Sequence, residues 1–321
     1  MCYKGNYEGE EQIFDFFYSG VFTTVLILPL LLFTLGISTS NFAQKKKPAA
    51  VSGIMGNETG DKESKNNSGT GNKELRIISA EKVMEMKIPE GGANGAAIVY
   101  HPKEKLYYAA QAGNKVFPLV IFDKDGDVLS AEDQQTMIDV RGLWYNPKTK
   151  KIGGNGYDEF GWFTYDLNKK GLPETINIFK EGSFQPDKNS AGVLNTEDDE
   201  VLFLDGLNVV CYNTDGTDKK KTIQLHIGSM NSKDGVTTTS TDFETNYNAR
   251  SIIYTEIKGA EIGLLNITKK QVELYDIKTG YMSQVIKLPV EFELETYFNF
   301  TFCNGIYWVF DKQSRKWMGY K

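Results

Sequence analysis

The chain of 321 residues repeats one pattern, in which an apolar strand, a polar turn and a second apolar strand follow one another. The clearest copies are AAIVYHPKEKLYYAAQ (96 to 111) and GLWYNPKTKKIGGNG (142 to 156), where His-Pro or Asn-Pro opens a Lys-rich turn. Weaker copies span 192 to 206, 251 to 266 and 298 to 311. Because repetition at a regular period is the signature of repeat architectures, the pattern predicts an all-β protein built from similar sheets.

Each repeat continues into a third strand and then, in most copies, a fourth. The fourth strands are predicted at 174 to 182, 221 to 228 and 283 to 289, with 127 to 132 a poorer copy. The fifth repeat stops at Lys321 after three strands, and KVMEMKIP (82 to 89) has the pattern of its missing fourth strand. Five four-stranded units of about 47 residues, the last completed by this N-terminal strand, form a ring without an open edge. Residues 229 to 248 leave six units as the alternative.

This strand rhythm, over about residues 78 to 321, resembles the β-propeller superclass to which WD40, NHL and YncE-like proteins belong. The Trp-Asp and Gly-His signatures of such repeats are absent. The resemblance implies a β-propeller, with the repeats as its blades, and it implies no particular activity, cofactor or partner.

The stretch VIFDKDGDVL (120 to 129) places three aspartates at alternate positions, as a calcium loop would. An EF-hand loop opening at Asp123 needs glycine at position 128 and glutamate at 134, where the sequence has Val128 and Gln134. The stretch also aligns with the turns after the third strands of the other repeats. We therefore predict that it is a hairpin turn, in which Asp and Gly cap the backbone.

The N-terminal part of the chain is predicted to be a membrane-targeting segment, because residues 16 to 44 contain no charged side chain. One interpretation is a signal peptide over 1 to 43, cleaved after Ala43, which predicts a periplasmic or secreted protein. The alternative is an uncleaved anchor. Acidic residues precede the run and KKK follows it, which suggests that the true start lies elsewhere than Met1.

Residues 44 to 77 are rich in Gly, Asn, Ser and Lys, so we expect a flexible polar linker before a propeller domain over 78 to 321. Of the three cysteines, Cys211 and Cys303 sit inside apolar strand patterns. One disulfide and two isolated buried thiols are both compatible with this pattern, and we expect the thiols.

The composition limits the classes of partner. The formal net charge is −6, whereas nucleic-acid binding depends on Lys and Arg that neutralise phosphates. We therefore expect no nucleic-acid partner, and membrane contact only through the N-terminal segment. The remaining partners are an unknown protein or a small anionic or carbohydrate ligand, bound by a monomer.

Ligand sites of propellers usually gather on the loop face, where loops that join one blade to the next lie beside loops between second and third strands. Arg141 and Arg250 start the first strands of their blades and could grip a carboxylate or phosphate there. The structural alternative is that each arginine pairs with a neighbouring carboxylate, Asp139 or Glu244, and supports a loop.

Further candidates come from two loops on the same predicted face. EGGANG (90 to 95) supplies Asn94, and GYDEFGW supplies Tyr157 and Trp162, which could stack on a sugar. For the aromatic pair, the alternative is a structural role in capping the core. The candidate ligand-binding set is Arg141, Arg250, Asn94, Tyr157, Trp162 and Asp139.

Nothing in the sequence identifies a catalytic site. The two histidines, His101 and His226, are not spaced with cysteines for zinc, and no Ser-His pair can be assigned. We expect no metal and no cofactor. A non-catalytic binding propeller is therefore the first hypothesis, and a structural envelope module is another alternative. A glycoside hydrolase or lyase would use pore-side carboxylates, for which the candidates are Asp139, Asp158, Glu159 and Glu295.

Overall fold

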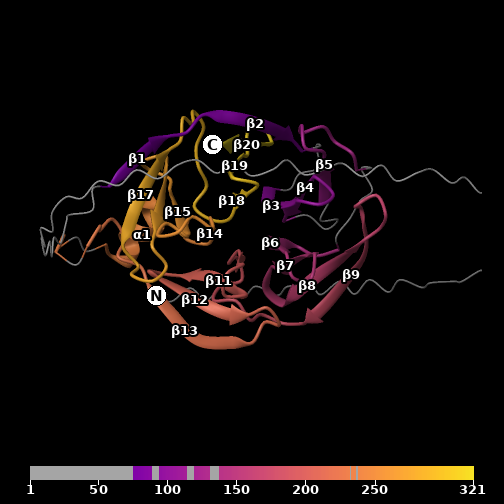
Figure 1. The fold of residues 1–321 in the computed structure, drawn as a ribbon, viewed down its shortest axis with the longest axis horizontal. Coiled ribbons are helices and arrows are strands. Elements are labelled where there is room, and N and C mark those ends of the chain that lie inside the picture. Colours follow the sequence, from indigo (N-terminus) through magenta and orange to yellow (C-terminus); the bar gives the residue numbers. More distant parts are fainter. Residues whose placement is uncertain (1–74, 89–93, 114–118, 131–136, 232, 236–237) are drawn as a thin grey trace, which may run out of the picture. The chain divides into compact units, whose positions relative to one another are not determined.

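Five β-sheets arranged around a centre form the described part of the chain (Figure 1). The structure is a computed structural model that describes residues 75–88, 94–113, 119–130, 137–231, 233–235 and 238–321. The predicted signal or anchor and most of the predicted linker lie outside these residues. Within them, none of the helices has the length and apolar character needed to span a bilayer.

The sheets follow one another in chain order. Sheet one contains β3 (Asn94–His101), β4 (Leu106–Ala112) and β5 (Leu119–Phe122). Sheet two contains β6 (Val140–Asn146), β7 (Lys151–Gly156), β8 (Trp162–Leu167) and β9 (Pro173–Lys180). Sheet three contains β10 (Val193–Asn195), β11 (Glu200–Asp205), β12 (Asn208–Asn213) and β13 (Asp218–Gln224). Sheet four contains β14 (Ile253–Tyr254), β15 (Ile262–Asn266), β16 (Gln271–Tyr275), β17 (Met282–Lys287) and β1 (Arg76–Ser79). Sheet five contains β18 (Phe300–Cys303), β19 (Ile306–Asp311), β20 (Lys316–Tyr320) and β2 (Lys82–Lys87).

This arrangement is the all-β, five-bladed propeller that the repeats predict, and six blades are not formed. The segment between β13 and β14 contains the short helix α1 (Ser240–Asn246) and no strand in its described residues. A 3-10 turn, η1 (Asp158–Phe160), lies between β7 and β8. Sheet one has three strands among the described residues, and the bridge between Val128 and Phe122 stands where its fourth strand is predicted.

The N-terminal strands connect two neighbouring sheets. Strand β1 runs parallel to β17, with Arg76 opposite Gln284, and β2 then runs antiparallel to β20, with Met86 opposite Trp317. The same short segment therefore covers the outer edge of sheet four and supplies the outer strand of sheet five. Strand β1 begins inside the range 44 to 77 that the sequence predicts as linker, because a parallel edge strand of four residues has little periodic signal.

Apolar side chains fill each of the five junctions between neighbouring sheets. Trp144 of sheet two packs with Phe203 of sheet three in one cluster, and Met86 and Trp317 of sheet five pack with Ile98 of sheet one in another. Three further clusters join sheets one and two, three and four, and four and five. A sheet between two neighbours buries both faces, which explains why the strand runs are continuously apolar.

Hydrogen bonds also join each sheet to the next at the loop face, and we call this set the polar belt. The bonds are Gly113 N to Asp139 Oδ1 (2.9 Å), Asn155 Nδ2 to Ser190 O (2.9 Å), Ala191 N to Arg250 O (2.8 Å), Asn248 Nδ2 to Phe298 O (3.0 Å) and Asn299 Nδ2 to Gly95 O. The close approach requires Gly142, since a Cβ there would lie 2.5 Å from Gly192 O. The belt closes the ring at its narrow centre.

The aspartate-rich stretch forms the predicted turn after β5. The Asp123 carboxylate accepts hydrogen bonds from the backbone N–H groups of Asp125 (2.8 Å) and Asp127 (3.0 Å), and Gly126 has a φ of 95°. These bonds to the charged form lower the pKa of Asp123 below its usual value. Asp123 therefore caps the turn as the sequence predicts.

The burial of β2 predicts which of its side chains stabilise the ring. Met86 is fully buried at the junction of sheets five and one, whereas Val83 on the same strand is 50% exposed. Met86→Ala should lower the free energy of unfolding by about 2–5 kcal/mol, because it leaves a cavity at the junction. Val83→Ala should change it by less than about 0.5 kcal/mol. Urea denaturation of both variants measures this, and equal effects would show that β2 does not complete sheet five.

Candidate functional site

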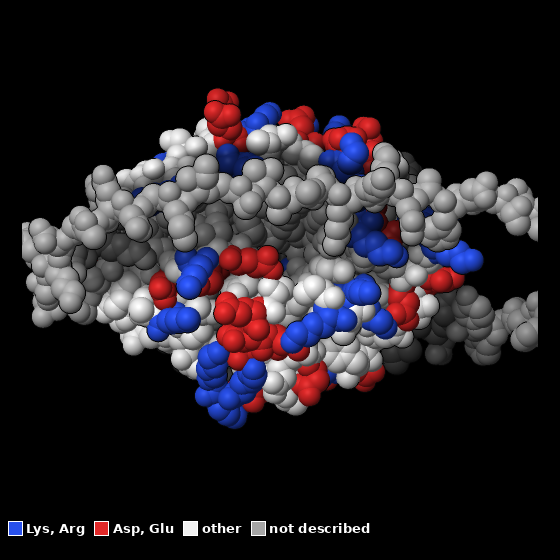
Figure 2. Space-filling model, viewed as in Figure 1, with Lys and Arg blue, Asp and Glu red and all other residues white. Residues whose placement is uncertain are grey.

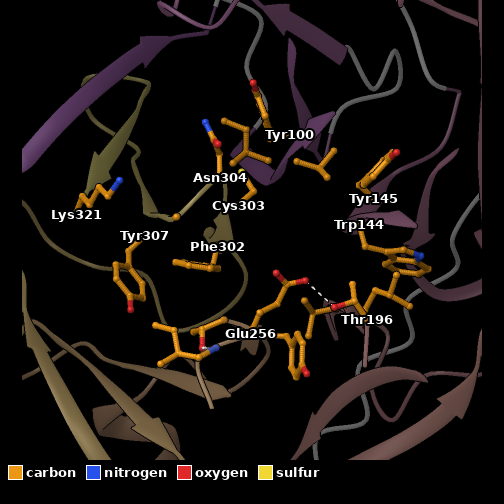
Figure 3. Close-up of a pocket in the computed structure, with 18 of the residues that line it drawn as sticks. Tyr100, Trp144, Tyr145, Thr196, Glu256, Phe302, Cys303, Asn304, Tyr307 and Lys321 are labelled. Atoms are coloured by element: carbon orange, nitrogen blue, oxygen red, sulfur yellow. Dashed lines mark hydrogen bonds between the residues drawn. The ribbon is translucent and has the colours of Figure 1, made fainter. Parts of the chain in front are cut away.

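A cavity of about 770 Å³ lies at the end of the ring opposite the polar belt. The C-terminal ends of the first strands of all five sheets line it, together with the turns that follow those strands (Figure 3). We call this end of the ring the turn face. Exposed residues of the turns, such as Pro102, Pro147 and Glu256, form the rim.

The inner walls of the cavity are apolar and aromatic. They include Leu143 and Trp144 of β6, Leu194 of β10, Tyr254 of β14 and Phe302 of β18. Four of these side chains are also buried in the junctions between sheets, so the ring packing itself fixes their positions. Rigid apolar walls with few polar groups are typical of small-molecule sites.

The polar groups of the cavity lie in two places. On one side, Thr196 Oγ1 donates a hydrogen bond to Glu256 Oε1 (2.6 Å), and Figure 3 shows this pair below Phe302. Glu256 has a φ of 62°, a left-handed conformation that is uncommon for a residue with a Cβ. Where sheets four and five contribute, the lining includes Arg76, Lys321 and Tyr307.

Burial keeps two titratable groups of the lining neutral. Desolvation raises the pKa of Tyr307 to about 12 and raises the pKa of Cys303 well above the usual range of a thiol. Tyr307 is therefore a hydroxyl donor at neutral pH, and Cys303 is a thiol with little nucleophilic thiolate. Cys211 and Cys303 are both free cysteines, as the sequence predicts.

The chemistry of the lining is limited. Among the described residues that line the cavity, Glu256 is the one carboxylate. In the part of the chain that the structure describes, no group of three or more His, Cys, Asp or Glu is arranged to hold a metal ion. His101 lies beside the turn face, where its Nδ1 accepts from Glu104 N (3.3 Å) and its ring contacts Tyr145 edge-on at 4.6 Å.

Two of the sequence-predicted site residues, Asp139 and Arg141, meet in a buried ion pair on the loop face. Arg141 Nη1 lies 2.6 Å from Asp139 Oδ1, and both residues are more than 90% buried. The guanidinium also lies 4.6 Å from the ring centroid of Tyr157 and 4.7 Å from that of Phe298. Tyr157 belongs to sheet two and Phe298 precedes sheet five, so Arg141 joins sheets that are not neighbours. Arg141 therefore forms the supporting ion pair that the sequence offers as the alternative to ligand binding, because a carboxylate and two aromatic rings already surround its guanidinium group.

Arg250 is also paired on the loop face. Its Nε lies 3.3 Å from Asp187 Oδ1 and its Nη2 lies 3.8 Å from Glu244 Oε1. Glu244 is the partner that the sequence predicts for Arg250. Asp187 lies in the loop between β9 of sheet two and β10 of sheet three. Part of the Arg250 side chain, 25%, remains exposed.

The other two candidates differ in position. Asn94 begins β3 at the loop face and is half-buried. The sequence predicts Trp162 at a blade end that is open to a ligand, and this prediction is wrong because the residue is fully buried. Its ring packs against Trp144, Phe203 and Tyr212 at the junction of sheets two and three. The core-capping alternative therefore holds for Trp162.

Sequence reasoning missed the turn face, although the repeats carry a signal for it. Aligned first strands place an aromatic residue at or next to their last position, at Tyr100, Tyr145, Tyr254 and Phe302, and all four line the cavity. A repeated aromatic at the inner edge of four of the five sheets predicts a shared aromatic wall. Arg76 and Lys321 carry no such signal, because only the pairings of β1 and β20 bring them there.

Charges of both signs are interspersed over the described part of the face in Figure 2. Clusters include Lys219 and Lys221 around Glu200, at 2.6 and 2.9 Å. These two lysines lower the pKa of Glu200 in spite of the opposing effect of its burial.

No protein-family model matches this sequence, and no curated protein matches it. Solved structures do match. The glutaminyl cyclase of Myxococcus xanthus aligns over 77% of this chain and 98% of its own, with 12% identity and a TM-score of 0.50. A structural-genomics protein of unknown function from Bacteroides thetaiotaomicron aligns over 72% and 60%, with 10% identity and a TM-score of 0.44. At 12% identity the similarity to the cyclase concerns the fold alone.

The buried ion pair predicts a large effect on stability. Arg141→Ala leaves the Asp139 carboxylate buried without its cation, so it should lower the free energy of unfolding by about 3–5 kcal/mol. Lys220→Ala removes the exposed ion pair with Asp218 and should leave the urea midpoint at the wild-type value. Equal midpoints for the two variants would mean that Arg141 is free to bind a ligand.

Proposed function

We propose that this protein is an exported, non-catalytic binding protein that holds a small molecule in the turn-face cavity. The observation that carries the proposal is the cavity of about 770 Å³ lined by all five sheets. Ligand pockets commonly have volumes of about 300–1,000 Å³, apolar walls and a few convergent polar groups. The location outside the cytoplasm rests on residues 16 to 44 and is part of the proposal.

The proposed site lies at the opposite end of the ring from the face that the sequence favours. On the loop face, Arg141 already has ionic and aromatic partners and its side chain is 5% exposed. At the turn face, Glu256 and Lys321 are exposed and line an open volume. A ligand gains more where apolar surface is open and pre-formed, because no existing ion pair has to be broken.

The two alternative functions gain less support. A retaining or inverting glycoside hydrolase uses two carboxylates across the sugar, and the described lining residues supply Glu256 alone. Of the carboxylates considered for that chemistry, Asp139 pairs with Arg141 and Glu295 pairs with Lys312 at 3.7 Å. A purely structural module has no use for a preformed cavity of this size.

The proposal predicts that filling the cavity abolishes binding. Val193 lines the cavity at the start of β10, so Val193→Trp should lower the affinity for the apolar fluorophore N-phenyl-1-naphthylamine by at least about tenfold. Val128 is 48% exposed at the edge of sheet one, and Val128→Trp, the matched control, should bind as the wild type does.

Fluorescence titration measures the affinities, and the melting temperature confirms that both variants are folded. Unchanged binding by a folded Val193→Trp variant would rule out the cavity as the site. Mass spectrometry of small molecules that co-purify with the wild-type protein, but not with the Val193→Trp variant, would then identify the natural ligand.

A further inference from the structure

Two cationic side chains line the cavity from the neighbouring sheets four and five. Arg76 belongs to β1, where it lies opposite Gln284 of β17, and Lys321 follows β20. Backbone hydrogen bonds with Glu81 (2.9 and 3.0 Å) hold Lys321 in place. Within the described residues, neither side chain forms an ion pair with a carboxylate within 4.0 Å, whereas Lys316, at the other end of β20, is paired with Glu85 at 2.6 Å. The cavity therefore has two cationic side chains in its lining that are not engaged in ion pairs.

Neutral hydrogen-bond donors accompany the two cations. Tyr307, whose hydroxyl stays protonated at neutral pH, and Gln284, which has a side-chain amide, are also members of the lining. Donors with formal charge bind an anionic oxygen more strongly than neutral donors do. Such a group of donors suits a carboxylate, sulfonate or phosphate.

The other side of the cavity has the opposite character. Glu256 carries a negative charge there, and Thr196 orients one of its oxygens. In the view of Figure 3, Phe302 lies between Lys321 and Glu256. An anionic group is attracted to one end and repelled from the other, so a ligand with a single anionic group has one favoured orientation.

The space between the two charged ends is apolar. Phe302, Tyr254 and Trp144 present ring surfaces, and Leu143 and Ile98 add aliphatic surface. A ring system or a hydrocarbon body gains from leaving water at such walls, by roughly 25 cal/mol for each Å² that is buried. A small inorganic anion alone would leave these walls unused.

We propose that the cavity takes an amphipathic anion, with its anionic group at Arg76 and Lys321 and its apolar, ring-containing body against the aromatic walls. This inference rests on the proposed function and adds the class of ligand. Because Arg76 reaches the cavity only through β1, the N-terminal strand takes part in recognition as well as in closing the ring.

A pair of probes that differ by one sulfonate tests the charge assignment. 8-Anilinonaphthalene-1-sulfonate has the same arylamine body as N-phenyl-1-naphthylamine and adds the anionic group. The wild-type protein should bind the sulfonate at least about tenfold more tightly. Added NaCl should weaken the binding of the sulfonate and leave that of the neutral probe unchanged, since salt screens exposed charges.

Two double variants test whether Arg76 and Lys321 cause the difference in affinity between the two probes. The double variant Arg76→Gln/Lys321→Met should bind the sulfonate about tenfold more weakly, at the level of the neutral probe, and should keep its affinity for the neutral probe. Lys169→Met/Lys170→Met removes the same charge from the exposed turn between β8 and β9, and should bind both probes as the wild type does.

The outcomes separate the two proposals. If the wild-type protein binds neither probe, the proposed function itself is wrong. Should it bind both probes equally, or should the two double variants behave alike, the cavity binds small molecules but the anion assignment is wrong. The probe pair and the salt series on the wild-type protein decide the assignment even where a variant does not fold.

Discussion

Closure of the ring is the constraint on which the rest of the structure depends. Each sheet buries both faces against its neighbours, and five apolar clusters fill the five junctions. The polar belt adds at least one hydrogen bond between each sheet and the next. Strand β2 completes the ring in sheet five, so the last junction forms only when the two ends of the propeller sequence meet. The stability of each sheet therefore depends on closure of the whole ring.

The same constraint makes the two ends of the ring different. At the loop face, the polar belt and the buried pair of Arg141 and Asp139 draw the sheets together. Arg141 also contacts Tyr157, which follows β7 of its own sheet, and Phe298, which precedes sheet five. At the turn face, no such pair spans the centre among the described lining residues, and the first strands enclose a cavity with apolar walls. Buried polar contacts hold the sheets together at one end, and the first strands enclose a cavity at the other.

The sequence predicts the fold well because two-sided burial gives the strands a continuous apolar pattern that repeats five times. It predicts the site poorly, because the sequence alone does not show whether a charged side chain is paired in the folded protein or free to bind a ligand. Asp139 and Arg141 are two residues apart, so they lie on the same side of an extended strand and can pair, a signal that favours the structural interpretation. Tyr100, Tyr145, Tyr254 and Phe302 mark the cavity in the aligned repeats. Lys321 could not be predicted, since its position depends on long-range pairing.

We propose that the turn face, and not the loop face, binds a small molecule. Hydrogen–deuterium exchange of the wild-type protein, with and without saturating N-phenyl-1-naphthylamine, tests it most directly, because exchange reports local opening at each backbone amide. Binding at the turn face should slow exchange at the ends of the first strands and in their turns, at 98–102, 143–147, 193–196, 254–257 and 302–305. Slower exchange at 137–141, 155–162 and 295–299, with no change in those turns, would contradict it.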